Sequence, residues 1–169
     1  RQGVFARRPR LLVSTPGDIT PVERRAALGS LQRAGAASVY LMPSAIASAL
    51  GAGLPLAEPV ASMVCNIGAG RTEIAVMSLS ETVVSRSLRS AGSTMDQAIV
   101  DYLHRQYSLT ISSTTAESLR TSAGSAFPVT SEKAVEAAGL DVISGQARRA
   151  SITTEEIREA LGPPLAKIL

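Results

Sequence analysis

The residues best placed to do chemistry form a turn, Gly68-Ala69-Gly70, which follows one apolar run at 62–67 and precedes another at 73–79. Glycines in such a turn let the backbone approach a phosphate group closely and present N–H donors to it. The spacing alone also fits an ordinary hairpin that needs positive φ angles. A dinucleotide-binding turn is excluded, because a helix should follow the glycines and a strand pattern follows instead.

Two other reactive side chains give weaker signals. Cys65 lies between the apolar residues Met63 and Ile67, which predicts a buried thiol on a strand rather than a nucleophile or a metal ligand. A single cysteine allows no intramolecular disulfide and fits a reducing compartment. His104 falls on a predicted helix far from the turn in sequence, so no catalytic role is predicted for it.

Strands alternate with helices along the first part of the chain. Thr20, Pro21 and Glu23 predict a helix start, because Thr20 can cap, proline suits the first helical position and Glu23 completes a capping box. The elements predicted here are strands at 11–13 and 38–42 and helices at about 21–34 and 44–51. A softer boundary at 51–59, rich in Gly and Pro, precedes the second part.

The second part combines hairpins with helices. Met95, Ile99 and Leu103 recur every four residues, which predicts a helix over about 94–106. Short turns join three consecutive antiparallel strands, predicted at 62–67, 73–79 and 82–88. The other predicted elements are a helix at 114–123, a hairpin of 135–143 and 147–152 around Ser144-Gly145, and a capped helix at 153–169 that Pro163 and Pro164 bend or interrupt.

The composition is that of a globular protein: of 169 residues, 45% are apolar, 18% charged and 3% aromatic. The formal net charge of +3 comes from arginines in the first ten residues. Nucleic-acid binders carry cations along a face with stacking aromatics nearby, so no nucleic-acid partner is expected. No apolar run reaches the roughly 20 residues of a spanning helix and no signal peptide is apparent, so a soluble, cytoplasmic protein is expected.

Several segments match one protein family in the same order along the chain. They are Arg10-Leu11-Leu12-Val13, Pro16-Gly17-Asp18-Ile19-Thr20, Ala34-Gly35-Ala36, Val39-Tyr40-Leu41, Gly51-Ala52-Gly53-Leu54-Pro55, Ser62-Met63-Val64, Glu73-Ile74-Ala75-Val76-Met77-Ser78-Leu79, Val83-Val84-Ser85-Arg86-Ser87, Met95-Asp96-Gln97-Ala98-Ile99, Thr115-Ala116-Glu117, Gly124-Ser125-Ala126 and Glu155-Glu156-Ile157-Arg158-Glu159-Ala160-Leu161. Through them the chain resembles the central half of MreB and Mbl, the bacterial actins.

This resemblance implies an α/β fold of the actin-like ATPase type, related to ribonuclease H, with a mixed sheet and flanking helices that are present here in part. It implies that residues 1–60 are part of the first actin-like lobe and that residues 61–169 form most of the second. It also implies a cytoplasmic protein that forms filaments with copies of itself. Those filaments lie at the inner face of the cell membrane and guide the cell-wall synthesis machinery and cell shape.

The resemblance also assigns nucleotide-binding residues. Gly68, Ala69 and Gly70 stand at the family's second phosphate turn, which usually has three glycines. Glu117 and Arg120 stand where the family has Glu-x-x-Lys facing the adenosine, whereas by themselves they predict only a solvated ion pair. The family's other two nucleotide loops have no counterpart in this sequence, so ATP with Mg²⁺ is expected to bind this chain weakly or not at all.

Three positions depart from the family pattern. Ser44 stands where the family has the glutamate that orients the attacking water. Asn66 replaces an aspartate near the magnesium shell, and Arg71 replaces the threonine after the glycines. An amide is not a charged partner for Mg²⁺ and serine is a poor substitute for a carboxylate, so no catalytic residue is assigned and impaired ATP hydrolysis is expected.

The start of the sequence suggests a membrane contact. Val4 and Phe5 precede Arg7, Arg8 and Arg10, where some bacterial actins insert a hydrophobic loop. An apolar pair beside arginines attracts anionic lipid, but one pair is marginal without the avidity of a polymer. The alternative is a flexible end.

Three functions remain open from the sequence. The first is a filament-forming MreB-like protein with impaired hydrolysis. The second is an active actin-like ATPase in which Arg71 and other groups replace the usual residues. The third is a degenerate actin-like interaction module that does not polymerise. Measurements of ATP turnover and of sedimentation with and without nucleotide distinguish the three.

Overall fold

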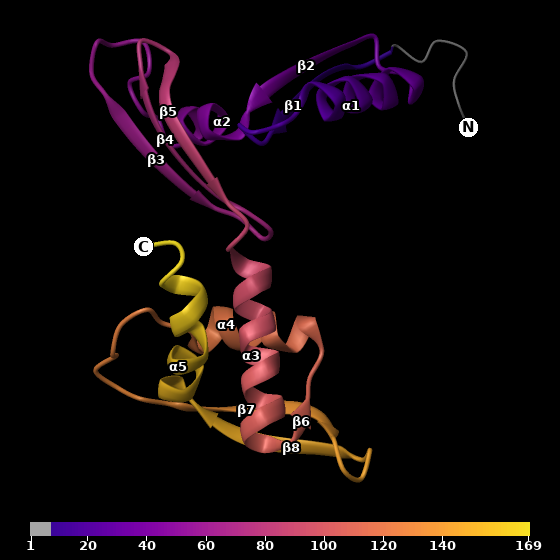
Figure 1. Ribbon diagram of the computed structural model, residues 1–169, viewed down its shortest axis with the longest axis vertical. Helices are drawn as coiled ribbons and strands as arrows, with labels where there is room; N and C mark the ends of the chain where they lie inside the picture. The colour runs from indigo at the N-terminus through magenta and orange to yellow at the C-terminus, as the bar shows by residue number, and fades with distance from the viewer. Residues whose placement is uncertain (1–7) are drawn as a thin grey trace. The chain divides into compact units, whose positions relative to one another are not determined.

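A computed structural model describes residues 8–169 of the chain (Figure 1). These residues form two compact units, one made of the chain up to Asn66 together with Glu73–Ser87, and the other of Ile67–Thr72 together with Leu88–Leu169. The expected division into two family lobes near residue 60 remains a prediction. Val4 and Phe5 lie outside the described residues.

The first unit opens with two parallel strands joined by a helix. Strands β1 (Arg10–Thr15) and β2 (Ser38–Pro43) pair in parallel, and helix α1 (Pro21–Arg33) makes the crossover that a parallel pair requires. The predicted capping box is present, because the Thr20 hydroxyl accepts from the Glu23 N–H at 3.2 Å and the Thr20 N–H donates to the Glu23 carboxylate at 2.9 Å. The predicted start of this helix is therefore confirmed.

A three-stranded sheet forms the rest of the first unit. Its order is β3 (Ser62–Ile67), β4 (Thr72–Ser78) and β5 (Glu81–Leu88), and the short connections between neighbours make them antiparallel, as predicted. Helix α2 (Ser44–Gly51), also predicted, packs on this sheet. The resulting core contains Ala45, Ala49, Leu56, Ala75 and Met77.

The prediction of a buried Cys65 is wrong. Side chains alternate between the two faces of a strand, and Val64 is the residue of β3 that packs against the core. Cys65 therefore falls on the other face with Met63 and Ile67, and all three are exposed. Apolar neighbours in sequence do not reveal which face of a strand is covered.

The second unit places three helices on one side of a three-stranded antiparallel sheet (Figure 1). The helices lie where they were predicted, although the last one is shorter, and are α3 (Gly92–Tyr107), α4 (Ser113–Ala123) and α5 (Thr154–Leu165). The strands are β6 (Leu109–Thr110), β7 (Ala134–Asp141) and β8 (Ala147–Thr153). The hairpin β7–β8 was predicted, whereas β6, with two residues, is too short to show a pattern.

The core of the second unit lies between these helices and the sheet. Met95, Ile99 and Leu103 are all buried there, which confirms the stripe seen in the sequence. Helix α5 keeps both of its prolines inside and ends at Leu165. The prediction that it runs to residue 169 is wrong, because two consecutive prolines remove two N–H donors from its last turn.

Candidate functional site

The glycine turn, residues 68–70, connects β3 to β4 and belongs to the second unit. Its backbone closes with a hydrogen bond from the Gly68 N–H to the Arg71 carbonyl at 2.9 Å. Just beyond it, the buried Thr72 hydroxyl donates to the Ser90 carbonyl at 2.7 Å. The turn is exposed, but the strand that leaves it is fixed to the segment before α3.

The start of helix α3 rests on the turn. The N–H of Gly92 donates to the carbonyl of Gly68 at 3.0 Å, and the N–H of Ser93 donates to the carbonyl of Ala69 at 2.6 Å. The first N–H groups of a helix have no partner within the helix. Here two carbonyl groups of the turn accept from two of these N–H groups, and the two hydrogen bonds hold the glycine turn and α3 together.

Arg120 is held by a residue that the sequence analysis did not assign to the site. Its Nε donates to Asp96 Oδ1 of α3 at 2.6 Å, whereas its Nη2 lies 3.8 Å from Glu117 Oε1. The Glu117 side chain is 63% exposed, compared with 15% for Asp96. Asp96 adjoins Met95 of the buried stripe, which is the sequence signal that could have identified it.

The second unit also brings Arg120 to the turn. A Cβ atom placed on Gly92 would lie 3.3 Å from the Gly68 carbonyl oxygen, 3.4 Å from Arg120 Nη2 and 3.5 Å from the Ala69 Cα. Arg120 Nη2 therefore lies beside the carbonyl side of the turn, where a guanidinium can meet a backbone acceptor. Glu117 is on the same helix as Arg120, and its carboxylate faces solvent.

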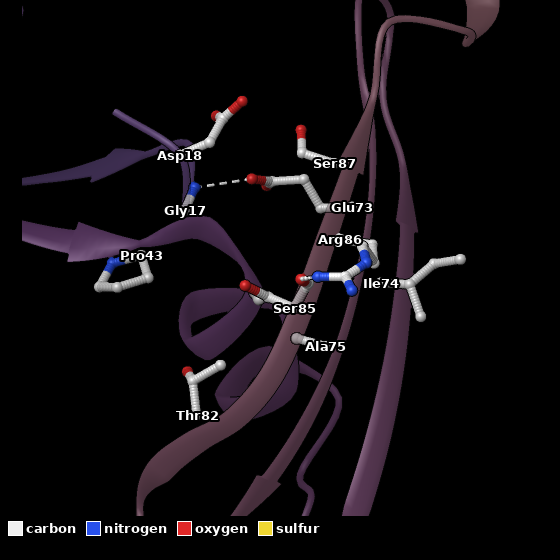
Figure 2. Close-up of a pocket in the computed structure, with 11 residues that line it drawn as sticks. Gly17, Asp18, Pro43, Glu73, Ile74, Ala75, Thr82, Ser85, Arg86 and Ser87 are labelled. Carbon is white, nitrogen blue, oxygen red and sulfur yellow. Dashed lines mark hydrogen bonds between the residues drawn. The ribbon is translucent and has the colours of Figure 1, made fainter. Parts of the chain in front are cut away.

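A second polar site lies within the first unit, around the buried side chain of Glu73. One carboxylate oxygen of Glu73 accepts from the Gly17 N–H at 2.7 Å, and the other accepts from the hydroxyl of Ser44. Figure 2 shows Glu73 reaching from β4 toward Gly17 across a cavity of about 270 Å³. Its further polar lining includes Asp18, Ser85, Arg86 and Ser87.

The three departing positions are distributed between the units. Ser44 begins α2 and donates its hydroxyl proton to Glu73, so the hydroxyl can only accept a hydrogen bond from water. Asn66 is half-buried near the end of β3, and Arg71 is half-buried at the end of the turn. Within residues 8–169 no group of three or more His, Cys, Asp or Glu side chains is arranged to hold a metal ion.

Two further features bear on the sequence predictions. His104 is on the exposed side of α3, in its last turn. In the part of the chain that the structure describes, no helix has the length and apolarity that crossing a membrane requires.

Comparison with known proteins identifies the family. The sequence matches the MreB/Mbl protein family over residues 1–169. It is 43% identical over 161 residues to the cell shape-determining protein MreB of Escherichia coli (strain K12), which covers 95% of this chain and 46% of that protein. It is 34% identical over 168 residues to the cell shape-determining protein Mbl of Bacillus subtilis (strain 168), covering 99% of this chain and 50% of that protein.

The fold is also similar to a solved structure. The crystal structure of MreB5 of Spiroplasma citri bound to ADP superimposes with a TM-score of 0.90 at 33% identity, covering 94% of this chain and 48% of that one. The chain thus spans about half the length of the relatives it matches. The expected actin-like α/β fold is confirmed in part of its extent, and the chain belongs to the MreB/Mbl family of bacterial actins.

Proposed function

We propose that the intact protein forms nucleotide-linked filaments at the inner face of the cell membrane, where they guide cell-wall synthesis and cell shape. The observation that carries this proposal is the family match over residues 1–169. Filaments, membrane and cell-wall machinery are what that family membership implies for the whole protein. The test is sedimentation and electron microscopy of the full-length protein with and without ATP, in which nucleotide-independent solubility would contradict the proposal.

We propose that Gly68, Ala69 and Gly70 face the phosphates of ATP and that Glu117 and Arg120 face its adenosine. The Spiroplasma citri relative, whose structure is bound to ADP, supports nucleotide binding. So does the position of Arg120, whose Nε bonds to Asp96 of α3 and whose Nη2 lies 3.4 Å from the point where a Gly92 Cβ would stand. Calorimetry of the full-length protein tests this: ATP should bind, and no heat at millimolar ATP would contradict the proposal.

Mg²⁺ would enter this site with the phosphates. Asn66 offers an amide oxygen, which can hold a magnesium-bound water but adds no charge. The described residues supply no carboxylate cluster of their own. The affinity of the site for Mg²⁺ should therefore come mainly from the phosphates of ATP. This 169-residue chain alone should bind the complex of ATP and Mg²⁺ weakly or not detectably.

We also propose that hydrolysis is impaired. In phosphoryl transfer the protein positions a water molecule and neutralises charge, and Ser44, Asn66 and Arg71 lack the family's groups for both. The Ser44 hydroxyl, moreover, is already a donor to Glu73. If each replacement costs roughly the 10²-fold of one lost catalytic group, turnover is near background.

Phosphate release tests this proposal. The full-length protein should release phosphate much more slowly than the triple variant S44E/N66D/R71T. Equal rates in the two proteins would contradict impaired hydrolysis. Sedimentation of both proteins with ATP serves as the control for polymerisation.

One observation favours a second candidate, the active ATPase. The Glu73 carboxylate stands within hydrogen-bonding distance of position 44, so a carboxylate remains next to the place where relatives carry theirs. If Glu73 orients water in this protein, E73Q should abolish a measurable wild-type turnover. If hydrolysis is already impaired, E73Q should leave the background rate unchanged.

The membrane contact remains a proposal about the first residues. When the protein is polymerised, Val4 and Phe5 with the adjacent arginines should bind anionic vesicles. Each basic residue near the membrane surface should contribute roughly 1 kcal/mol to the binding free energy. Cosedimentation with phosphatidylglycerol vesicles should fall for F5A and for the charge reversal R7E/R8E. Binding indifferent to both variants would remove this contact from the proposed function.

A further inference from the structure

We propose that the carboxylate of Glu73 is a latch that holds the loop between β1 and α1 on strand β4, and that serine at position 44 lets this latch close without bound nucleotide. The inference goes beyond the proposed function, because it concerns the protein free of nucleotide. Glu73 acts here through the groups that it binds, so its role is that of a positioning residue.

The first step is the bonding of the carboxylate itself. Glu73 is only 7% exposed, and one of its oxygens accepts from the Gly17 N–H at 2.7 Å (Figure 2). The other oxygen accepts from the Ser44 hydroxyl. A carboxylate offers acceptors only, and hydrogen bonds to its charge are stronger than those between neutral groups. One buried side chain of β4 therefore ties together two segments that lie 56 and 29 residues away in sequence.

The second step is what else holds these segments on the sheet. Helix α2 shares an apolar core with β4, to which Ala45 and Ala49 contribute from the helix and Ala75 and Met77 from the strand. Within residues 8–169, no residue of β1, of α1 or of the loop between them belongs to that core. The loop instead meets β4 through a polar bond, which costs less to break than an apolar core because water replaces the lost partner. The attachment of the loop is therefore of a kind that can open and close.

The third step is the residue at position 44, where the family has a glutamate. The serine hydroxyl of this chain donates to Glu73. A glutamate there would offer no donor, and it would bring a second negative charge close to the first, which repels it. Serine thus supplies the second donor that fixes the Glu73 carboxylate. In this chain the latch is complete with protein groups alone.

The exchange of backbone amides with deuterium separates a latch from a general stabilising role. Gly17 is exposed, so its amide is protected from exchange only while it is bonded to Glu73. An open latch should label the loop within minutes, while the buried amides of α2 stay unlabelled because they exchange only when the core opens. A merely stabilising Glu73 predicts that its removal brings label into the loop no sooner, relative to α2, than in the wild type.

The experiment is exchange mass spectrometry of the full-length protein without nucleotide, read on peptides that cover residues 15–19. E73A removes the acceptor and should speed exchange of this loop by about 10- to 100-fold. S44A, which is milder, should speed it by roughly 3- to 10-fold, because Glu73 loses one of its two anchors. S44E should speed it at least as much as S44A, because it adds a like charge. The double variant S44A/E73A should match E73A, because Ser44 acts on the loop through Glu73.

The matched control is S48A, the same substitution one turn further along α2, at a half-buried serine that takes no part in the bonds of Glu73. S48A should leave the exchange of the loop unchanged. Equal exchange of the loop in S44A and S48A overturns the inference, and so does loop exchange in E73A that keeps the wild-type ratio to that of α2.

ADP tests whether the latch closes without nucleotide. Addition of ADP should leave the exchange of residues 15–19 in the wild-type protein unchanged. A slowing by about 10-fold or more would show that the latch is open until nucleotide binds, which overturns the inference. If ADP does not bind in calorimetry, the proposed nucleotide site fails, while the comparison of the nucleotide-free variants still decides the latch.

Discussion

The N–H of Gly92 donates to the carbonyl oxygen of Gly68 at 3.0 Å, so helix α3 begins directly on the glycine turn. Gly92 is buried, and a Cβ there would lie 3.3 Å from that oxygen and 3.5 Å from the Ala69 Cα. Both are backbone atoms that move only with the turn. We expect G92A to lower the free energy of unfolding by about 1 kcal/mol, measured by urea denaturation of the full-length protein. An unchanged midpoint would show that the turn shifts freely.

Gly139 on β7 gives a stronger form of the same experiment. A Cβ there would lie 2.4 Å from the Thr110 carbonyl oxygen and 2.9 Å from Ile111 Cγ2, and the first of these is a backbone atom that no side-chain rotamer can move away. G139A should therefore cost roughly 1–3 kcal/mol of stability or more. Gly162 in α5 is the control, because its Cβ would meet nothing within 4 Å and a helical Gly to Ala change gains up to about 1 kcal/mol. Equal effects of G139A and G162A would contradict the packing of β6 against β7.

The side chains of Glu73 and Ser44 should be energetically coupled. E73A leaves the Gly17 N–H and the Ser44 hydroxyl without their acceptor, and we expect a loss of about 2–4 kcal/mol. S44A should cost less, about 1 kcal/mol, and the double variant should lose less than the sum of the two. Urea denaturation of the four proteins measures the coupling, and strict additivity would show that the two side chains do not interact.

The tyrosines of α3 should titrate at unusually high pH. Burial, together with a hydrogen bond to Glu159 and the charges nearby, raises the pKa of Tyr102 from 10.0 to about 12. Because this folded-state pKa lies above the unfolded one, the stabilisation is complete below about pH 10 and is lost as the pH rises toward 12. Absorbance titration should show one tyrosine ionising near pH 12 that Y102F removes. Three tyrosines titrating together near pH 10 would refute this.

The sequence was sufficient where a local rule decides the structure. The capping residues Thr20 and Glu23 fixed the start of α1, and the four-residue spacing of Met95, Ile99 and Leu103 identified the buried side of α3. Short turns likewise determined the order of β3, β4 and β5. Each of these features depends on residues close together in the chain.

The sequence was insufficient where distant residues decide. The exposure of Cys65 depends on which face of β3 the helix α2 covers, and the strand itself carries no sign of that. The bond of Ser44 to Glu73 joins positions 29 residues apart, and that of Arg120 to Asp96 joins positions 24 apart. Neither pair has the short spacing in sequence of neighbours on one helix or one strand, so only the fold brings the two residues of each pair together.

Helix α1 has no buried residue, whereas α3 buries five. Helix α1 contacts β2 through half-buried residues, so its capping box and its own backbone hydrogen bonds supply a larger share of its stability than in α3. Amides held mainly in this way exchange with solvent deuterium through brief fraying, whereas amides of a packed helix exchange when the surrounding core opens. The two helices should consequently differ in time scale, with α1 exchanging early and the middle of α3 among the last segments to become labelled.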